Sequence, residues 1–202
     1  MSIFNIFKKK KKYNNATFYQ QENLIQSKQN LIAIFSRQPI LTTNYPISYQ
    51  GIALDKIEKI NMINLLGEES YFMTNLENFV DHEIYFYRKN IEKFSLLLQV
   101  HFIKNTFFFA STKVSSEAVI TIKDKLKLVN LLLKNYPDIT ITKEFVDFEF
   151  TDKLGNILFI NDQIDLIFNY GCNIANNEFI NHLFSSNNIP TNKDNSNLSK
   201  YL

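Results

Sequence analysis

The spacing of apolar residues predicts two helices in the first third of the chain. In residues 16–36, apolar side chains recur every three or four positions, and Pro39 closes the segment. Residues 54–66 repeat this spacing and end at Gly67. Residues 38–52 contain two prolines and a glycine, which indicates a loop with a short extended piece.

The middle of the chain changes to the two-residue period of β-strands. Residues 83–88 are rich in aromatic, β-prone side chains, and residues 94–103 alternate between two faces. One face carries Phe94, Leu96, Leu98, Val100 and Phe102, and the more polar face carries Ser95, Leu97, Gln99, His101 and Ile103. Lys104 and Asn105 predict a two-residue turn, so residues 106–113 return as the second strand of a hairpin and Phe108 faces His101.

A longer helix is predicted after this hairpin. Ser115 and Ser116 followed by Glu117 indicate a helix start, and the apolar stripe runs through Ile122, Leu126, Val129, Leu133 and Tyr136 to Pro137. Three lysines fall on one side of this helix: Lys123, Lys127 and Lys134. Asp124 interrupts their positive field, so the pattern favours a solvated face over a nucleic-acid stripe.

The last part of the chain predicts a second hairpin and two short helices. Residues 144–151 and 157–160 are the strands, and Gly155 provides the backbone freedom that the turn between them needs. Residues 162–169 and 177–184 are expected to be short helices broken at Gly171.

The order of these elements predicts an α+β fold, with a mainly antiparallel sheet built from hairpins and helices packed on one face. Residues 1–15 form a hydrophobic and polylysine leader, residues 16–184 a single domain, and residues 185–202 a polar tail with little to bury. With 45% apolar residues in a chain of 202, a substantial core is expected.

The leader divides the chain electrostatically. The whole chain has a net charge of +2, and without the five leader lysines it has a net charge of −3. The residues that could contact a membrane or an anion are Phe4, Phe7, Lys8, Lys9, Lys10, Lys11 and Lys12. At about 1 kcal/mol per lysine, the five charges would supply roughly 5 kcal/mol at an anionic membrane surface.

Three interpretations of the leader stay open. It is a solvated segment that aids solubility, a contact to an anionic membrane surface through residues 1–13, or a contact to nucleic-acid phosphates. The acidic body disfavours nucleic acid as a partner. The leader resembles the N-termini of many small bacterial proteins, some of which are immunity proteins that guard against toxins.

Two carboxylates are weak candidates for chemistry. Asp147 and Glu149 alternate with apolar residues, so both project from one face of a strand, roughly 7 Å apart. That spacing suits paired acid and base catalysis, with His101 as a helper, or a cation held together with Asp162 and Asp165. The alternative is simple alternation, with the charged side in water.

The histidines and the single cysteine are interpreted as structural. The acids flanking His82 predict a raised pKa for this histidine, which is expected in a surface turn. His101 is expected at a half-buried strand position, and His182 on the surface of a helix. Their positions show no metal-ligand spacing. Cys172 is expected to be a small buried residue, and as the only cysteine it excludes an intramolecular disulfide and favours a reducing compartment.

Missing motifs exclude several functions. The four glycines cannot form the phosphate-binding glycine loops or the nucleophile elbow of serine hydrolases, and no cofactor is predicted. The leading hypothesis is a non-enzymatic, cytoplasmic protein-binding module, with toxin neutralisation as a specific version and Tyr85, Phe86 and Tyr87 as anchors for the partner. The alternatives are a peripheral protein held at the inner face of the membrane by the leader, and a hydrolase using the paired carboxylates.

Overall fold

The computed structural model describes residues 16–74, 81–140, 147–173 and 181. Four α-helices and a short 3-10 helix form there: α1 (Ala16–Glu22), α2 (Lys28–Phe35), η1 (Leu54–Lys56), α3 (Lys59–Leu66) and α4 (Ile122–Leu133). The strands of the main sheet are β1 (Leu41–Thr43), β4 (Tyr71–Thr74), β5 (His82–Ile91), β6 (Phe94–Ile103), β7 (Thr106–Ser116), β8 (Glu149–Asp152), β9 (Ile157–Asp162) and β10 (Leu166–Gly171). Strands β2 (Ser48–Tyr49) and β3 (Ile52–Ala53) form a separate two-stranded sheet.

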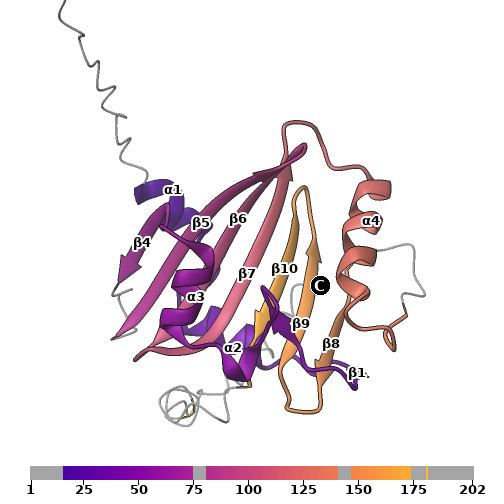
Figure 1. Cartoon of the computed structure of the whole chain (residues 1–202), viewed down its shortest axis with the longest axis horizontal. Coiled ribbons are helices and arrows are strands. Elements are labelled where there is room, and N and C mark those ends of the chain that lie inside the picture. Colours follow the sequence, from indigo (N-terminus) through magenta and orange to yellow (C-terminus); the bar gives the residue numbers. More distant parts are fainter. Residues whose placement is uncertain (1–15, 75–80, 141–146, 174–180, 182–202) are drawn as a thin grey trace, which may run out of the picture.

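The eight-stranded sheet has the order β1-β8-β9-β10-β7-β6-β5-β4 (Figure 1). All its neighbouring strands are antiparallel except β1 and β8, which are parallel. The prediction of a mixed fold with a mainly antiparallel sheet is therefore confirmed.

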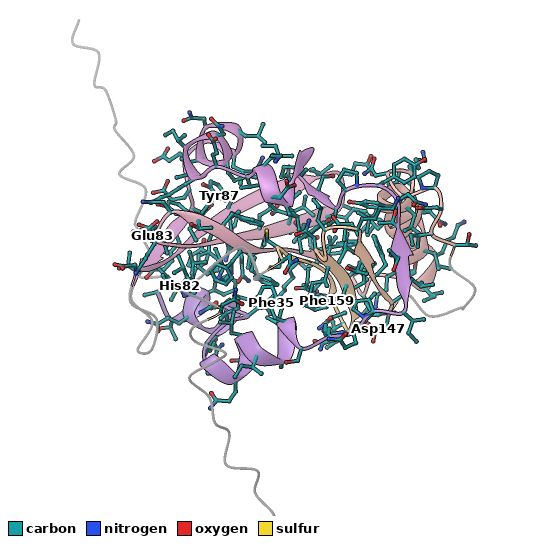
Figure 2. All side chains as sticks on the ribbon, turned by 90° about the horizontal axis from the view of Figure 1, so that it is seen from below. Phe35, His82, Glu83, Tyr87, Asp147 and Phe159 are labelled. Carbon is teal, nitrogen blue, oxygen red and sulfur yellow. The ribbon has the colours of Figure 1, made fainter. Side chains whose placement is uncertain are left out.

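Helices lie on both faces of this sheet, not on one. The largest core cluster joins Met62 of α3 and Val129 of α4 to one face. Leu31 of α2 and Tyr19 of α1 belong to two smaller clusters on the other face. Figure 2 shows the sheet nearly edge-on, with helical segments above and below it. We call these the α3/α4 face and the α1/α2 face. The prediction of a single covered face was wrong because the polar side of β6 is also buried.

Local signals explain most helix boundaries. Ser27 caps α2 by accepting a hydrogen bond from the backbone N–H of Asn30, so the predicted helix over residues 16–36 is interrupted and becomes α1 and α2. Helix α3 ends at Gly67, as predicted. The φ of this residue is +84°, a backbone conformation that glycine adopts without strain. The helix start predicted at Ser115 was wrong, since β7 continues to Ser116 and α4 begins after Thr121.

The hairpin of β6 and β7 is confirmed, with one change in register. Lys104 and Asn105 adopt φ values of +48° and +64°, the left-handed pair that a two-residue turn requires. A bulge between His101 and Phe102 shifts the pairing, so His101 faces Phe109 and not Phe108.

The second hairpin is also confirmed in its described part, where β8 and β9 flank a turn with Gly155 at φ +79°. Residues 162–169 are not a helix, because β10 occupies Leu166–Gly171 in the middle of the sheet. Residues 177–180 and 182–202, which include most of the second predicted helix and the polar tail, lie outside the described residues, as do residues 144–146.

Candidate functional site

Helix α4 is held on the sheet by one of its sides. Thr121 caps its N-terminus, and Lys125, Val129 and Leu133 follow at four-residue spacing and are buried. The buried ammonium of Lys125 donates to the carboxylate of Asp162 and to a backbone carbonyl beside it. This side of the helix is therefore fully used by the fold.

Apolar side chains also line the solvent-accessible part of α4, where Leu131 points away from the sheet and Leu126 packs against the edge of the core. A shallow groove of about 580 Å³ runs along the helix. Its lining combines three apolar residues with three lysines: Ile122, Leu126, Leu131, Lys123, Lys127 and Lys134. Ile122, which the sequence placed in the core, is 53% exposed, and Leu131 is 49% exposed. We call this surface the α4 groove.

The lysines lie between the apolar residues of the α4 groove. Because each residue of a helix advances by about 100°, Ile122 and Leu126 fall on one edge and Leu131 on the other. The three lysines project from the strip between these edges. The surface is therefore a positive row with apolar flanks, and not an apolar face beside a basic one.

The positive charge of this row is largely uncompensated. Within the part of the chain that the structure describes, none of the three lysines forms an ion pair with a carboxylate. Asp124, the only carboxylate of α4, pairs with Lys93 at 2.7 Å. Hydrogen bonds from Lys93 and Thr121, and the charge of Lys127, lower the pKa of Asp124.

A larger cleft of about 650 Å³ opens beside α3. Apolar side chains of η1 and α3 meet the first residues of β7 and the end of β10, where Cys172 lies. We call this the α3 cleft. It is separate from the α4 groove, since the two share no lining residue.

The paired carboxylates do not form a catalytic pair with His101. Glu149 is bound by the guanidinium of Arg37, at 2.5 Å, and this guanidinium also stacks on the ring of Phe159. Burial raises the pKa of Asp147. The charge of Arg37 lowers this pKa, and the charges of Asp162 and Glu149 raise it. Glu149 in β8 and His101 in β6 are four strand spacings apart in the sheet, about 19 Å.

The histidines of the sheet form a buried pair that the sequence did not predict. His82 Nε2 lies 3.1 Å from His101 Nδ1, on the α1/α2 face beside Phe108 and Phe109. Both side chains are inaccessible, so His82 is not in a surface turn and His101 is not half-buried. Burial lowers the pKa of His82 to about 4, and burial and then His82 lower the pKa of His101 well below its usual value. The raised pKa expected for His82 was wrong because Glu83 points to the other face, where it binds Lys59.

Cys172 is buried, as predicted. Burial first, and then the charges of Asp55 and Asp152, raise the pKa of its thiol to about 11. The thiol is therefore neutral at physiological pH and a poor nucleophile.

The proposed aromatic anchors are core residues. Tyr85 and Tyr87 belong to the cluster on the α3/α4 face, and Phe86 belongs to a cluster on the α1/α2 face. Their side chains offer no contact surface to a partner of the folded protein. The physical reason is that β5 lies inside the sheet, between β4 and β6.

Other predicted positions lie outside the described residues: Phe4, Phe7, the five leader lysines and His182. No helix in the described part is long and apolar enough to cross a membrane. The same residues contain no group of three or more His, Cys, Asp or Glu side chains that could hold a metal ion.

Comparison with known proteins gives no match: no family model, no curated protein and no solved structure is similar to this chain. The function is therefore argued from the surfaces of the molecule itself.

Sequence reasoning missed what makes the α4 groove distinctive. It identified the three lysines on one side of the helix and correctly placed Leu126 against the core, but it also assigned the exposed Ile122 to the core stripe. It also missed Lys125 as a buried cation. The sequence did contain a signal for the groove and for the buried lysine. A helix with lysines on two sides and leucines on two sides cannot bury all of its apolar residues against one sheet.

Proposed function

We propose that the protein is a non-enzymatic binding module for another protein, and that the α4 groove receives an acidic segment of that partner with apolar residues on either side. The observation that carries this proposal is the row of uncompensated lysines between apolar edges on the outward side of α4. An α-helix placed along such a groove can fill both edges at three- and four-residue spacing, which is a common mode of peptide recognition.

Charge and shape favour a protein over a membrane or a nucleic acid. A helix that lies in a membrane surface keeps its lysines away from its apolar face, whereas here the lysines are in the middle. Nucleic acid would use the lysines but would leave Ile122 and Leu131 against water or phosphate. An acidic protein segment satisfies both the charges and the apolar edges.

The α4 groove is proposed to bind an acidic partner, so it does not itself support neutralisation of a toxin with a basic active site. An acidic body that covers a basic toxin site would require a surface other than the α4 groove. Anchoring of the leader at an anionic membrane is a separate proposal, and liposome binding with and without residues 1–13 tests it. For the paired carboxylates, the bound Arg37 and the distant His101 favour an ion pair over hydrolysis.

The test uses one substitution in the groove and one matched control. Leu131→Glu places a carboxylate on the lysine row, and Leu154→Glu changes a leucine of equal exposure in the turn after β8. The full-length protein and both variants are used to capture partners from source cells, and the dominant partner is then purified and titrated.

We expect the purified partner to bind the wild type and Leu154→Glu equally, and to bind Leu131→Glu at least tenfold more weakly. Affinity should also fall as salt rises, because the contact is charged. A partner that binds all three proteins equally would overturn the assignment to the α4 groove. Binding of duplex DNA or of anionic vesicles through the same residues would replace the protein partner with that ligand.

A further inference from the structure

The α3 cleft has the size and the lining of a small-molecule site. Its volume of about 650 Å³ falls within the range of typical ligand pockets, roughly 300–1,000 Å³. Leu54, Ile57, Ile60, Ile63 and Phe107 give it an apolar wall from two separate parts of the chain. Ile60 is 62% exposed there, which is a large apolar surface to leave in water.

The wall of the cleft is fixed by the sheet. Glu58, the residue before α3, forms an isolated antiparallel bridge with Thr106 at the start of β7. Lys59 binds Glu83 of β5 and donates to the side chain of Asn105, at 3.0 Å. These contacts hold the beginning of α3 against two strands, so the cleft exists before any ligand arrives.

The charges that line the cleft leave an excess of negative charge. The positive charge of Lys59 is matched by Glu83, outside the cleft. Among the described residues Asp55 forms an ion pair only with its neighbour Lys56, whose side chain is 76% exposed, and such a pair contributes little. Glu58 accepts a hydrogen bond from Asn61 but has no ion pair within the described residues.

The remaining groups favour binding over reaction. Cys172 is neutral and buried at the end of β10, so it supplies neither an anion nor a thiolate to the cleft. Asn105 and Asn173 add polar groups without charge. Two carboxylates, an engaged lysine and an apolar wall together select a ligand with an apolar body and a positive charge.

We propose that the α3 cleft binds a small molecule with an apolar body and one cationic nitrogen. The apolar body packs against the isoleucines of α3 and Phe107, and the nitrogen lies beside Glu58 and Asp55. This inference is independent of the α4 groove, which has the opposite charge and lies on another helix.

Three probes with alkyl chains of seven or eight carbons and different head groups test the proposal: octylamine, octanol and octanoate. Each is titrated into the ¹⁵N-labelled full-length protein, and amide shifts of residues that line the cleft report binding. We expect octylamine to bind at least fivefold more tightly than octanol, and octanoate to bind most weakly.

Two pairs of variants separate the charge from the apolar wall. Glu58→Gln should reduce the affinity for octylamine toward that for octanol, whereas Glu68→Gln, an exposed position outside the cleft, should not reduce it. Ile60→Ser should weaken all three probes, whereas Leu65→Ser on the same helix should weaken none. Equal affinities for the three head groups, shifts confined to other residues, or no binding by octylamine would each overturn the proposal.

Discussion

Lowering the pH from 7.5 to 5 is expected to destabilise this fold through the buried pair of His82 and His101. In the unfolded chain a histidine takes up a proton near pH 6.5. In the folded chain burial holds the pKa of His82 at about 4 and lowers that of His101 well below its usual value. The unfolded chain therefore binds more protons in this window, and the free energy of unfolding falls as the pH falls. The stability due to the pair is fully present above about pH 6.5.

The expected loss is large compared with the stability of a typical domain. For His82 alone, a pKa that changes from 6.5 to about 4 on folding removes about 2 kcal/mol at pH 5 and about 3 kcal/mol at pH 4. His101 acts in the same direction. Typical domains have a free energy of unfolding of about 5–15 kcal/mol, so the loss would be easy to measure.

The assay is urea unfolding followed by circular dichroism at pH 7.5, 6.0 and 5.0. The double variant His82→Phe/His101→Phe removes both titrating rings from their apolar surroundings and should change by less than about 0.5 kcal/mol between pH 7.5 and 5. His182→Gln, the control, should retain the pH dependence of the wild type. A wild type that is equally stable at pH 7.5 and 5, or a double variant that loses as much as the wild type, would refute the reasoning.

Three further predictions concern stability and use the same unfolding assay at pH 7.5. Asp152→Ala should cost about 3 kcal/mol or more, because this buried carboxylate accepts hydrogen bonds from three backbone N–H groups and one side-chain amide, which would lose their partner; a loss under about 1 kcal/mol would contradict this. Gly155→Ala should be more destabilising than Gly51→Ala, since both glycines have φ near +80° but only at Gly155 would the new Cβ meet a side-chain nitrogen at 2.8 Å; equal losses would show that the neighbour moves freely. Lys125→Met should cost about 3 kcal/mol by leaving the carboxylate of Asp162, whose side chain is only 15% exposed, without its ion pair, whereas Arg37→Met should cost about 1 kcal/mol or less because its ion pair is about one-third exposed; the reverse order would contradict the burial argument.

The elements that the sequence predicted correctly have a strong local signal. The strand over residues 94–103 has one apolar and one mixed face, and its turn needs only two residues, so β6 and the start of β7 are readable from the chain alone. Strand β10 lies in the middle of the sheet with both faces buried, and its apolar run Leu166, Ile167 and Phe168 has no two-residue period. A continuous run of this kind fits a short helix or a central strand, and only the neighbouring strands decide between them.

The candidate sites also depend on contacts between distant parts of the chain, which the local sequence does not reveal. The sequence predicted that Asp147 and Glu149 project from one face of a strand, but nothing nearby in the chain indicates that Arg37 binds Glu149 from more than a hundred residues away. The pairing of His82 with His101 depends on the register of β5 and β6, which the sequence does not specify. In the α4 groove the residues are local, yet which of them face outward depends on where the sheet lies.

The parallel pairing of β1 and β8 has a consequence for how the chain assembles. These two strands are neighbours in the sheet although more than a hundred residues separate them. At roughly 5–20 residues per second of synthesis, β1 leaves the ribosome on the order of 5–20 s before its partner exists. The meander from β5 to β7 can form during that time, since its strands are joined by two-residue turns. The edge of the sheet formed by β1 is therefore completed late. In a nascent chain arrested before β8, strand β1 would have no strand to pair with.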